Sequence, residues 1–170
     1  NKIFELFDLD DSIYNLSTIE AIKKIFQSFQ QVLKKTGPSD KIDNQKLNMI
    51  NTIEAVLSFG GTVQCSGTRD IFSTILINLN ILKKNEIRLV DLFRYINLKS
   101  IVPNGHSVLE IKVKDRWIVL DPFIGIFLKK KYSDEYLNSA DIKKYLNLKM
   151  LNNIRIEKLS DEVVIGSDKG

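Results

Sequence analysis

Apolar side chains recur at intervals of three and four residues in the first third of the chain, which is the spacing of an amphipathic helix. Ser17 and Glu20 have the spacing of an N-terminal capping box, and Gly37 and Pro38 provide a stop. A helix is therefore predicted over about 18–35. Its apolar stripe consists of Ile19, Ile22, Ile25, Phe26, Phe29, Val32 and Leu33.

The same spacing appears in a second stretch, which starts after Asp40 or Asp43 and ends at Gly60 and Gly61. Its apolar positions are Leu47, Ile50, Ile53, Val56 and Leu57. The first third thus predicts two amphipathic helices. A third helix is predicted after Cys65, and it should be central and buried because its apolar surface is wider than one stripe. That surface consists of Ile71, Phe72, Ile75, Leu76, Ile77, Leu79, Ile81 and Leu82.

The pattern then changes to short segments rich in β-branched and aromatic residues, which is typical of strands. These segments are IRLVDLF at 87–93, HSVLEIKV at 106–113 and RWIVLD at 116–121. The last two are predicted to form a hairpin, since only two residues separate them. A short helix is predicted over about 139–146, and the end of the chain from 160 has too little pattern to assign.

Length and composition are those of one globular domain. The 170 residues are 44% apolar and 27% charged, which suits a single substantial core and argues against disorder. No linker-like segment divides the chain. We therefore expect one domain, with a helical layer over about 1–59, a core over about 60–127 and a C-terminal extension over about 128–170.

Charge and hydropathy narrow the classes of function. The formal charge is +4 without an arginine-rich tract, so nucleic-acid binding is not predicted. No apolar run approaches the roughly 18 to 20 residues that cross a bilayer, so we expect a soluble protein without a transmembrane segment. A single cysteine fits either redox compartment. The compartment stays open, with the cytoplasm favoured unless an upstream signal has been removed.

The chain contains one cysteine and one histidine, Cys65 and His106. Thiol catalysis needs a thiolate, a histidine within reach of the sulfur, and a third group that orients the imidazole. Cys65 follows a glycine pair at or just before the first turn of the third predicted helix, where unpaired N–H groups and the helix dipole favour a thiolate. One Cys and one His without repeated ligand spacing do not form a zinc site, so no metal or cofactor is predicted.

The predicted hairpin identifies the third group. With a two-residue turn at 114–115, the numbers of paired positions sum to 229. His106 then stands opposite Phe123 and diagonal to Asp121, on the same face of the sheet. Asp121 is therefore the carboxylate that can orient His106.

Both faces of the hairpin are largely apolar, so the strands should be buried on both sides. One face carries His106, Val108, Trp117, Val119 and Asp121, and the other carries Leu109, Ile111, Ile118 and Leu120. We expect the third helix to pack on the face of His106 and Asp121, which would bring Cys65 beside His106.

These residues resemble the transglutaminase-like superfamily of papain-related thiol enzymes. The resemblance rests on the order of Cys65, His106 and Asp121, on the strand IRLV after the cysteine-bearing helix, and on the segments GHSVLEI and RWIVLDP. It covers about 60–127. It implies an α+β fold in which N-terminal helices and a nucleophile-bearing central helix pack on a mainly antiparallel sheet.

The resemblance also implies a role for each matched residue. Cys65 attacks an acyl carbon, His106 carries the proton and Asp121 orients His106. The backbone N–H of Cys65 and one further donor would form the oxyanion hole, and Gln64 is the nearest side-chain candidate for that donor. Crosslinking members of the family have a tryptophan upstream of the nucleophile, whereas this chain has only Trp117, downstream, which favours a hydrolase.

The expected function is a cysteine hydrolase of the protease or amidase type, and two alternatives stay open. One is an acyltransferase that passes the thioester to an amine, as transglutaminases and arylamine acetyltransferases do. The other is a catalytically idle binding module, in which Cys65 and His106 only pack and Asp121 only ends a strand. Peptide, glycopeptide and small amide all remain possible substrates, and the oligomeric state is not predicted.

Overall fold

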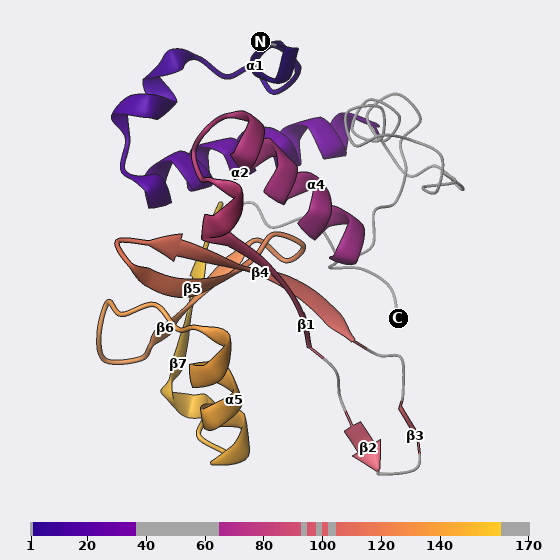
Figure 1. Cartoon of the computed structure of the whole chain (residues 1–170), viewed down its shortest axis with the longest axis vertical. Coiled ribbons are helices and arrows are strands. Elements are labelled where there is room, and N and C mark those ends of the chain that lie inside the picture. Colours follow the sequence, from indigo (N-terminus) through magenta and orange to yellow (C-terminus); the bar gives the residue numbers. More distant parts are fainter. Residues whose placement is uncertain (1, 37–64, 93–94, 98–99, 102–104, 161–170) are drawn as a thin grey trace.

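The computed structural model describes residues 2–36, 65–92, 95–97, 100–101 and 105–160, and its centre is a five-stranded sheet (Figure 1). Each strand is antiparallel to its neighbour. The order across the sheet is β1 (Ile87–Leu92), β4 (His106–Val113), β5 (Arg116–Asp121), β6 (Ile126–Lys130) and β7 (Ile154–Lys158). The fold is therefore α+β.

The connection between β1 and β4 contains two further strands, β2 (Tyr95–Asn97) and β3 (Ser100–Ile101), which pair with each other away from the main sheet (Figure 1). The sequence pattern does not predict these two strands. Strands of three and two residues are too short to display alternation.

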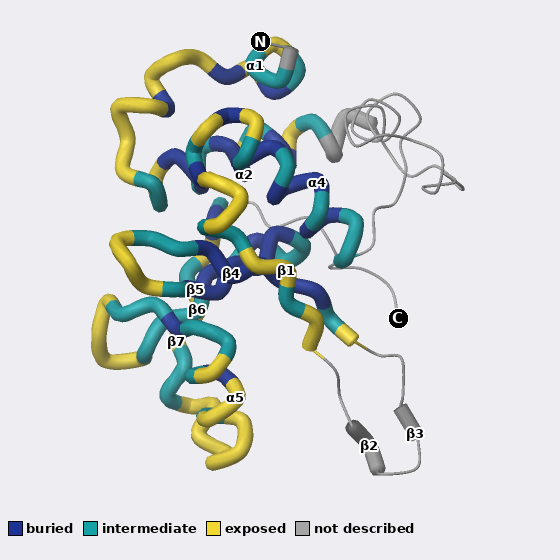
Figure 2. The backbone as a smooth tube through the Cα atoms, viewed as in Figure 1, coloured by how far each residue is buried: buried dark blue, intermediate teal, exposed yellow. Residues whose placement is uncertain are grey.

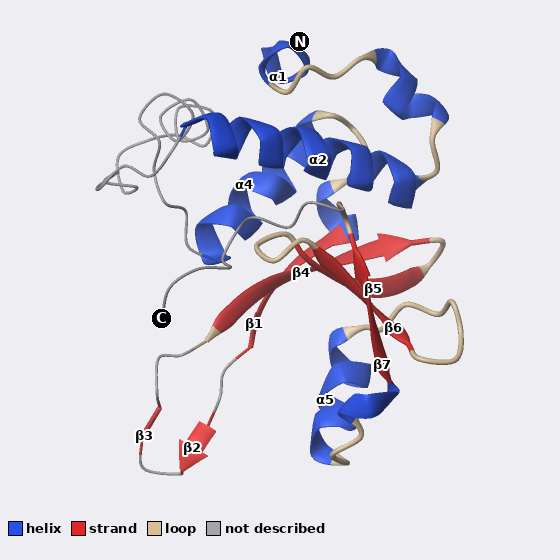
Figure 3. Cartoon of the chain, turned by 180° about the vertical axis from the view of Figure 1, so that it is seen from behind, coloured by secondary structure: helices blue, strands red, loops and turns tan. Residues whose placement is uncertain are grey.

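Helices cover both faces of the sheet, as the view from behind also shows (Figure 3). One face carries the N-terminal helices and the cysteine-bearing helix. These are α1 (Lys2–Leu6), the 3₁₀ turn η1 (Asp11–Asn15), α2 (Thr18–Thr36) and α4 (Cys65–Asn78). The other face carries α5 (Ser139–Asn147). Two short 3₁₀ turns, η2 (Lys84–Glu86) and η3 (Leu151–Asn153), precede β1 and β7.

The predicted helices at 18–35 and 139–146 are confirmed as α2 and α5. The third predicted helix is confirmed as α4, although it ends at Asn78, so that Leu79, Ile81 and Leu82 lie beyond it. The capping box of α2 is present, because the backbone N–H of Ser17 donates to Glu20 Oε2 at 3.1 Å and that of Glu20 donates to Ser17 Oγ at 3.4 Å. The helix predicted from Asp40 or Asp43 to about position 57 lies outside the described residues.

The hairpin has the predicted turn. Val113 pairs with Arg116. Lys114 and Asp115 between them have positive φ angles of 48° and 62°, as a tight hairpin turn of this length requires. The three predicted strands are confirmed as β1, β4 and β5, and so is the antiparallel hairpin of the last two; position 93 of the first lies outside the described residues.

The packing of α4 differs from the expectation. Its apolar side chains share one buried cluster with the sheet face that carries Leu109, Ile111, Ile118 and Leu120, and the buried parts of β4, β5 and α4 face each other there (Figure 2). The prediction that this helix packs on the face of His106 and Asp121 is therefore wrong.

The chemistry of the two faces explains this choice. The face beneath α4 offers long aliphatic side chains that match the wide apolar surface of the helix, and its polar groups, Asp91 and Ser107, are met by Arg69 of α4. The opposite face holds the smaller Val108 and Val119 beside the carboxylates of Glu110 and Asp121. It is covered by α5 through a smaller cluster that includes Leu137 and Ile142.

Within the described ranges, no helix is both long enough and apolar enough to cross a bilayer.

Candidate functional site

His106 opens β4 and Asp121 ends β5, and a hydrogen bond joins Nε2 of the imidazole to Oδ2 of the carboxylate. The side chain of Asp121 is 7% exposed, whereas that of His106 is 36% exposed. The register of the hairpin produces this contact, since paired positions such as Leu109 and Leu120 sum to the predicted 229. The predicted proximity of His106 and Asp121 is confirmed.

The turn after β5 holds the carboxylate of Asp121 in place. Its Oδ1 accepts hydrogen bonds from the backbone N–H groups of Phe123 and Ile124, at 3.0 and 3.2 Å. Its backbone carbonyl accepts from Gly125 N at 2.9 Å. Gly125 has a φ of +69°, and a Cβ there would lie 2.7 Å from the ring of Phe26. A glycine therefore closes the turn that directs Oδ2 at His106.

The hydrogen bond also determines which ring nitrogen of His106 is available. An ionised carboxylate only accepts hydrogen bonds, so Nε2 carries the hydrogen and Nδ1 of the neutral ring keeps its lone pair. The ring of Phe123 lies beside the imidazole, with 6.0 Å between the centroids. Leu92 is the cross-strand neighbour of His106 on β1. The imidazole of His106 is thus partly exposed and lies between two apolar neighbours, Phe123 and Leu92.

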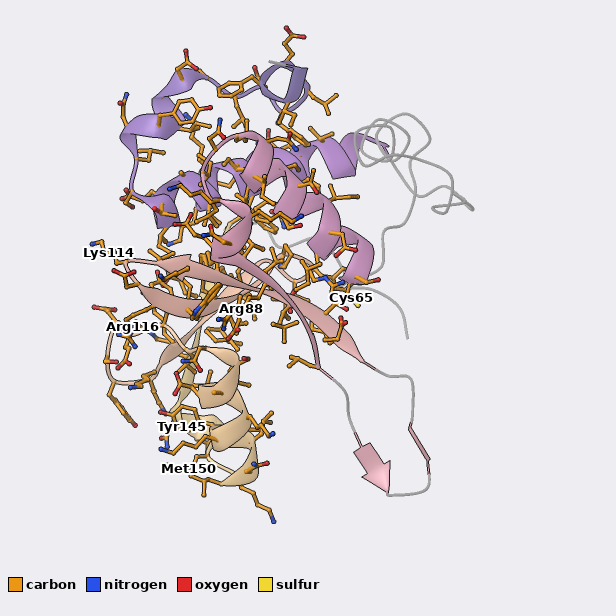
Figure 4. All side chains as sticks on the ribbon, viewed as in Figure 1. Cys65, Arg88, Lys114, Arg116, Tyr145 and Met150 are labelled. Carbon is orange, nitrogen blue, oxygen red and sulfur yellow. The ribbon has the colours of Figure 1, made fainter. Side chains whose placement is uncertain are left out.

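Cys65 is the first residue of α4 and is half-buried. At this position its backbone N–H has no partner within the helix, as is general for the first turn. Figure 4 shows Cys65 at the end of α4 near the start of β4, the strand against which α4 packs.

The structure does not connect all the predicted site residues. Within the part of the chain that it describes, no hydrogen bond joins the thiol of Cys65 to His106. Gln64, the predicted second oxyanion donor, lies outside the described residues. The structure thus brings His106 and Asp121 into contact, whereas Cys65 begins a helix that packs on the opposite face of β4. The predicted packing that was to bring Cys65 beside His106 is therefore not present.

A buried arginine connects the first turns of α4 to the sheet through an ion pair. The side chain of Arg69 is 9% exposed, and its guanidinium bonds to Asp70 at 2.8 Å and to Asp91 on β1. Asp91 also accepts a 2.7 Å hydrogen bond from the hydroxyl of Ser107 on β4. The hydroxyl of Ser107 and the positive charge of Arg69 together lower the pKa of Asp91. We call Arg69, Asp91 and Ser107 the α4 clamp.

The α4 clamp fixes where along β4 the first turns of α4 lie. Arg69 follows Cys65 by about one helical turn, a rise of roughly 6 Å. Ser107 follows His106 by one strand residue, a rise of about 3.3 Å. The clamp therefore holds the first turns of α4 near the start of β4, on the face of the sheet opposite to the side chain of His106. The periodicity of the chain does not predict the α4 clamp. An arginine beside the apolar surface of a central helix is nevertheless a signal that a buried partner exists.

The buried carboxylate of Glu110 has a structural role. Its Oε1 accepts from the backbone N–H and the hydroxyl of Ser139, both at 2.7 Å, at the start of α5. Arg88 lies 3.8 Å from its Oε2 and places its guanidinium 3.6 Å from the centroid of a Trp117 ring. Because these contacts occupy it, Glu110 is not a candidate acid or base.

Among the described residues, no group of three or more His, Cys, Asp and Glu side chains is arranged to hold a metal ion.

Comparison with protein-family models, with curated proteins and with solved structures finds no match for this chain.

Proposed function

We propose that this protein is a cysteine hydrolase with a transglutaminase-like fold, which cleaves an amide bond through a thioester on Cys65. The observation that carries the proposal is the hydrogen bond between His106 and Asp121. The buried carboxylate is fixed by the turn after β5 and leaves Nδ1 of a partly exposed imidazole available. This is how a third residue orients a catalytic base.

The arrangement of the elements supports the same proposal. The helix that begins with the cysteine packs against β4, the strand that begins with the histidine, on the face opposite to that of Asp121, and the carboxylate ends the next strand of the hairpin. The order Cys65, His106, Asp121 resembles that of transglutaminase-like enzymes. The α4 clamp adds a polar connection between the helix and the histidine-bearing strand.

The proposed reaction has two stages. In the first, Nδ1 of His106 takes the proton of the Cys65 thiol, and the thiolate attacks the acyl carbon of the amide. The imidazolium then gives this proton to the departing amine, and the thioester remains. In the second, His106 takes a proton from water as the water oxygen attacks the thioester carbon. The C–S bond then breaks and the imidazolium returns that proton to the sulfur, which releases the acid and restores the thiol. The Cys65 backbone N–H would donate to the oxyanion in both stages.

The substrate class under this proposal is a peptide, glycopeptide or small amide. Product analysis with an amide substrate separates hydrolysis from acyl transfer. Free acid as the product means that water accepts the acyl group, whereas an adduct with an added amine means that the protein is an acyltransferase.

The reactivity of Cys65 tests whether the protein has a catalytic thiol at all. Since the chain has only this cysteine, an iodoacetamide label reports on it alone. A thiolate paired with an imidazolium reacts at mildly acidic pH, whereas an ordinary thiol reacts only at alkaline pH. We expect acid-side labelling of the native protein, its loss in His106→Ala, and no labelling in Cys65→Ala at any pH.

Leu89→Ser, an exposed change on β1, is the control and should label like the native protein. The proposal fails if Cys65 reacts only at alkaline pH or only after denaturation. Either result would favour an idle binding module on the same scaffold.

A further inference from the structure

The turn that follows α5 exposes a series of apolar side chains. All residues from 146 to 152 are exposed. Leu146, Leu148, Met150 and Leu151 are 53%, 55%, 40% and 54% exposed, respectively. We call residues 146–151 the α5 tip. It lies at the end of α5 away from the sheet, on the opposite side of the sheet from α2 and α4 (Figure 2).

The α5 tip is held in a defined conformation. The backbone N–H of Lys149 donates to the carbonyl of Leu146 at 3.1 Å, and that of Met150 donates to the carbonyl of Tyr145 at 2.8 Å. This is the hydrogen-bond pattern of a Schellman motif at a helix C-terminus. Tyr145 packs on the apolar cluster beneath α5, and Met150 follows it at the end of the helix (Figure 4). The exposed side chains are thus presented by an ordered turn.

Lys149 occupies the left-handed position of this motif, with a φ of +57°. Glycine or asparagine adopts that conformation with less strain. A lysine there adds a positive charge next in sequence to the exposed Leu148 and Met150.

The charges around the α5 tip are positive. Positions 142–156 contain Lys143, Lys144, Lys149 and Arg155 and no acidic residue. Asp134 pairs with Arg155 at 2.8 Å. The three lysines are exposed, and none forms an ion pair within the residues that the structure describes. The surface therefore combines exposed aliphatic side chains with uncompensated positive charge.

We propose that the α5 tip is a docking site for the surface of an anionic phospholipid bilayer. The aliphatic side chains enter the boundary between headgroups and acyl chains, and Lys143, Lys144 and Lys149 contact the anionic headgroups. Charge complementarity favours an anionic surface. A projecting turn suits a deformable bilayer better than a protein groove, and the exposed tip has no aromatic side chain for stacking on nucleic-acid bases.

Co-sedimentation of the full chain with vesicles tests the proposal. We expect binding to vesicles of phosphatidylcholine with phosphatidylglycerol, little binding to phosphatidylcholine alone, and weaker binding at high salt. Combined Leu148→Ser, Met150→Ser and Leu151→Ser changes should weaken binding by roughly tenfold or more, through lost apolar burial. Each Lys→Gln change at 143, 144 or 149 should weaken it by about fivefold. Leu89→Ser, 55% exposed on β1, is the matched control and should bind normally.

A fluorescent probe locates the contact. In a Cys65→Ser background, Met150→Cys and Asp115→Cys each provide one labelling site, and the second lies in the exposed turn of the β4–β5 hairpin. An environment-sensitive fluorophore should shift to shorter wavelength with the anionic vesicles at position 150 and not at 115.

Three results would overturn the proposal. The first is no binding to the anionic vesicles, and the second is binding that the tip changes leave unaltered. The third is a shift at position 150 that depends on protein concentration and needs no vesicles, which would make the α5 tip an interface between copies of the chain. None of these results depends on the reactivity of Cys65.

Discussion

At the scale of single residues, the side chain of Asp121 divides its hydrogen bonds between its two oxygens. Oδ1 accepts from two backbone N–H groups of the following turn, and Oδ2 faces the imidazole. An amide can still accept at one oxygen, but its NH₂ group offers a donor to a nitrogen that is already a donor. The geometry therefore depends on a carboxylate and not only on the shape of the side chain.

Asp121→Asn should accordingly retain the fold but reverse the tautomer preference of His106. If Cys65, His106 and Asp121 form the proposed triad, turnover of an amide substrate falls by on the order of 10³ to 10⁴. Steady-state kinetics measure this effect, and a thermal melt checks that the protein stays folded. Asp115→Asn, in the exposed hairpin turn, is the control and should keep full activity. Unchanged turnover in Asp121→Asn would remove Asp121 from the mechanism.

At the scale of elements, the α4 clamp provides the polar contact between the nucleophile helix and the strands. Arg69 is buried on α4, while Asp91 and Ser107 are direct partners in the register of β1 and β4. The apolar cluster below α4 fixes the face on which the helix packs. A charged hydrogen bond adds direction to that packing, because its geometry tolerates less displacement than an apolar contact.

Arg69→Met should therefore disturb the position of Cys65 more than it disturbs the fold. We expect a stability loss of about 1 to 3 kcal/mol from the lost charged hydrogen bonds, measured by urea denaturation. Acid-side labelling of Cys65 should fall by on the order of tenfold to a hundredfold, since small displacements of a reacting group are costly. Arg69→Lys should restore part of the labelling. If labelling is unchanged while stability falls, Arg69 has only a structural role.

At the scale of the whole molecule, Glu157 connects the helical layer to the sheet. Its carboxylate on β7 pairs with Lys129 on β6 and with Lys23 on α2. Burial acts to raise the pKa of Glu157, but the hydrogen bonds and charges of Lys129 and Lys23 outweigh this and hold the pKa below its usual range. The ion pairs of Glu157 with Lys129 and Lys23 thus stabilise the packing of α2 on the sheet in a pH-dependent way.

The sign of that dependence follows from proton binding. With its pKa lowered by folding, Glu157 binds fewer protons in the folded state, so its stabilisation is full above the unfolded pKa and is lost as pH falls through the folded pKa. Glu157→Gln should cost about 1 to 3 kcal/mol of unfolding free energy at neutral pH. The difference in unfolding free energy between this variant and the native protein should become smaller at acidic pH, which urea denaturation at several pH values measures.

Glu135→Gln provides the comparison for this measurement. Glu135 pairs with Arg116 and Lys130 at a more exposed position, so solvent screens its contribution and its loss should cost less at neutral pH. If the difference in unfolding free energy between Glu157→Gln and the native protein stays constant from neutral to acidic pH, the lowered pKa of Glu157 is contradicted.

The sequence by itself determined three helices, three of the five strands of the main sheet and one contact of the site. Helical spacing and the capping box at Ser17 and Glu20 are local, so α2 was predictable, and the same is true of α4 and α5. The contact between His106 and Asp121 was also predictable, because a two-residue turn leaves only one register for the hairpin.

Only the tertiary structure decided how these elements meet. Both faces of the hairpin are apolar in sequence, so the pattern could not reveal which of them α4 covers. Two sets of polar contacts join residues from separate elements: the α4 clamp, and the hydrogen bonds from Ser139 at the start of α5 to Glu110. No local spacing in the sequence predicts such pairs. Periodicity records the faces of an element, whereas the choice among faces depends on the shapes and polar groups of all the elements that pack together.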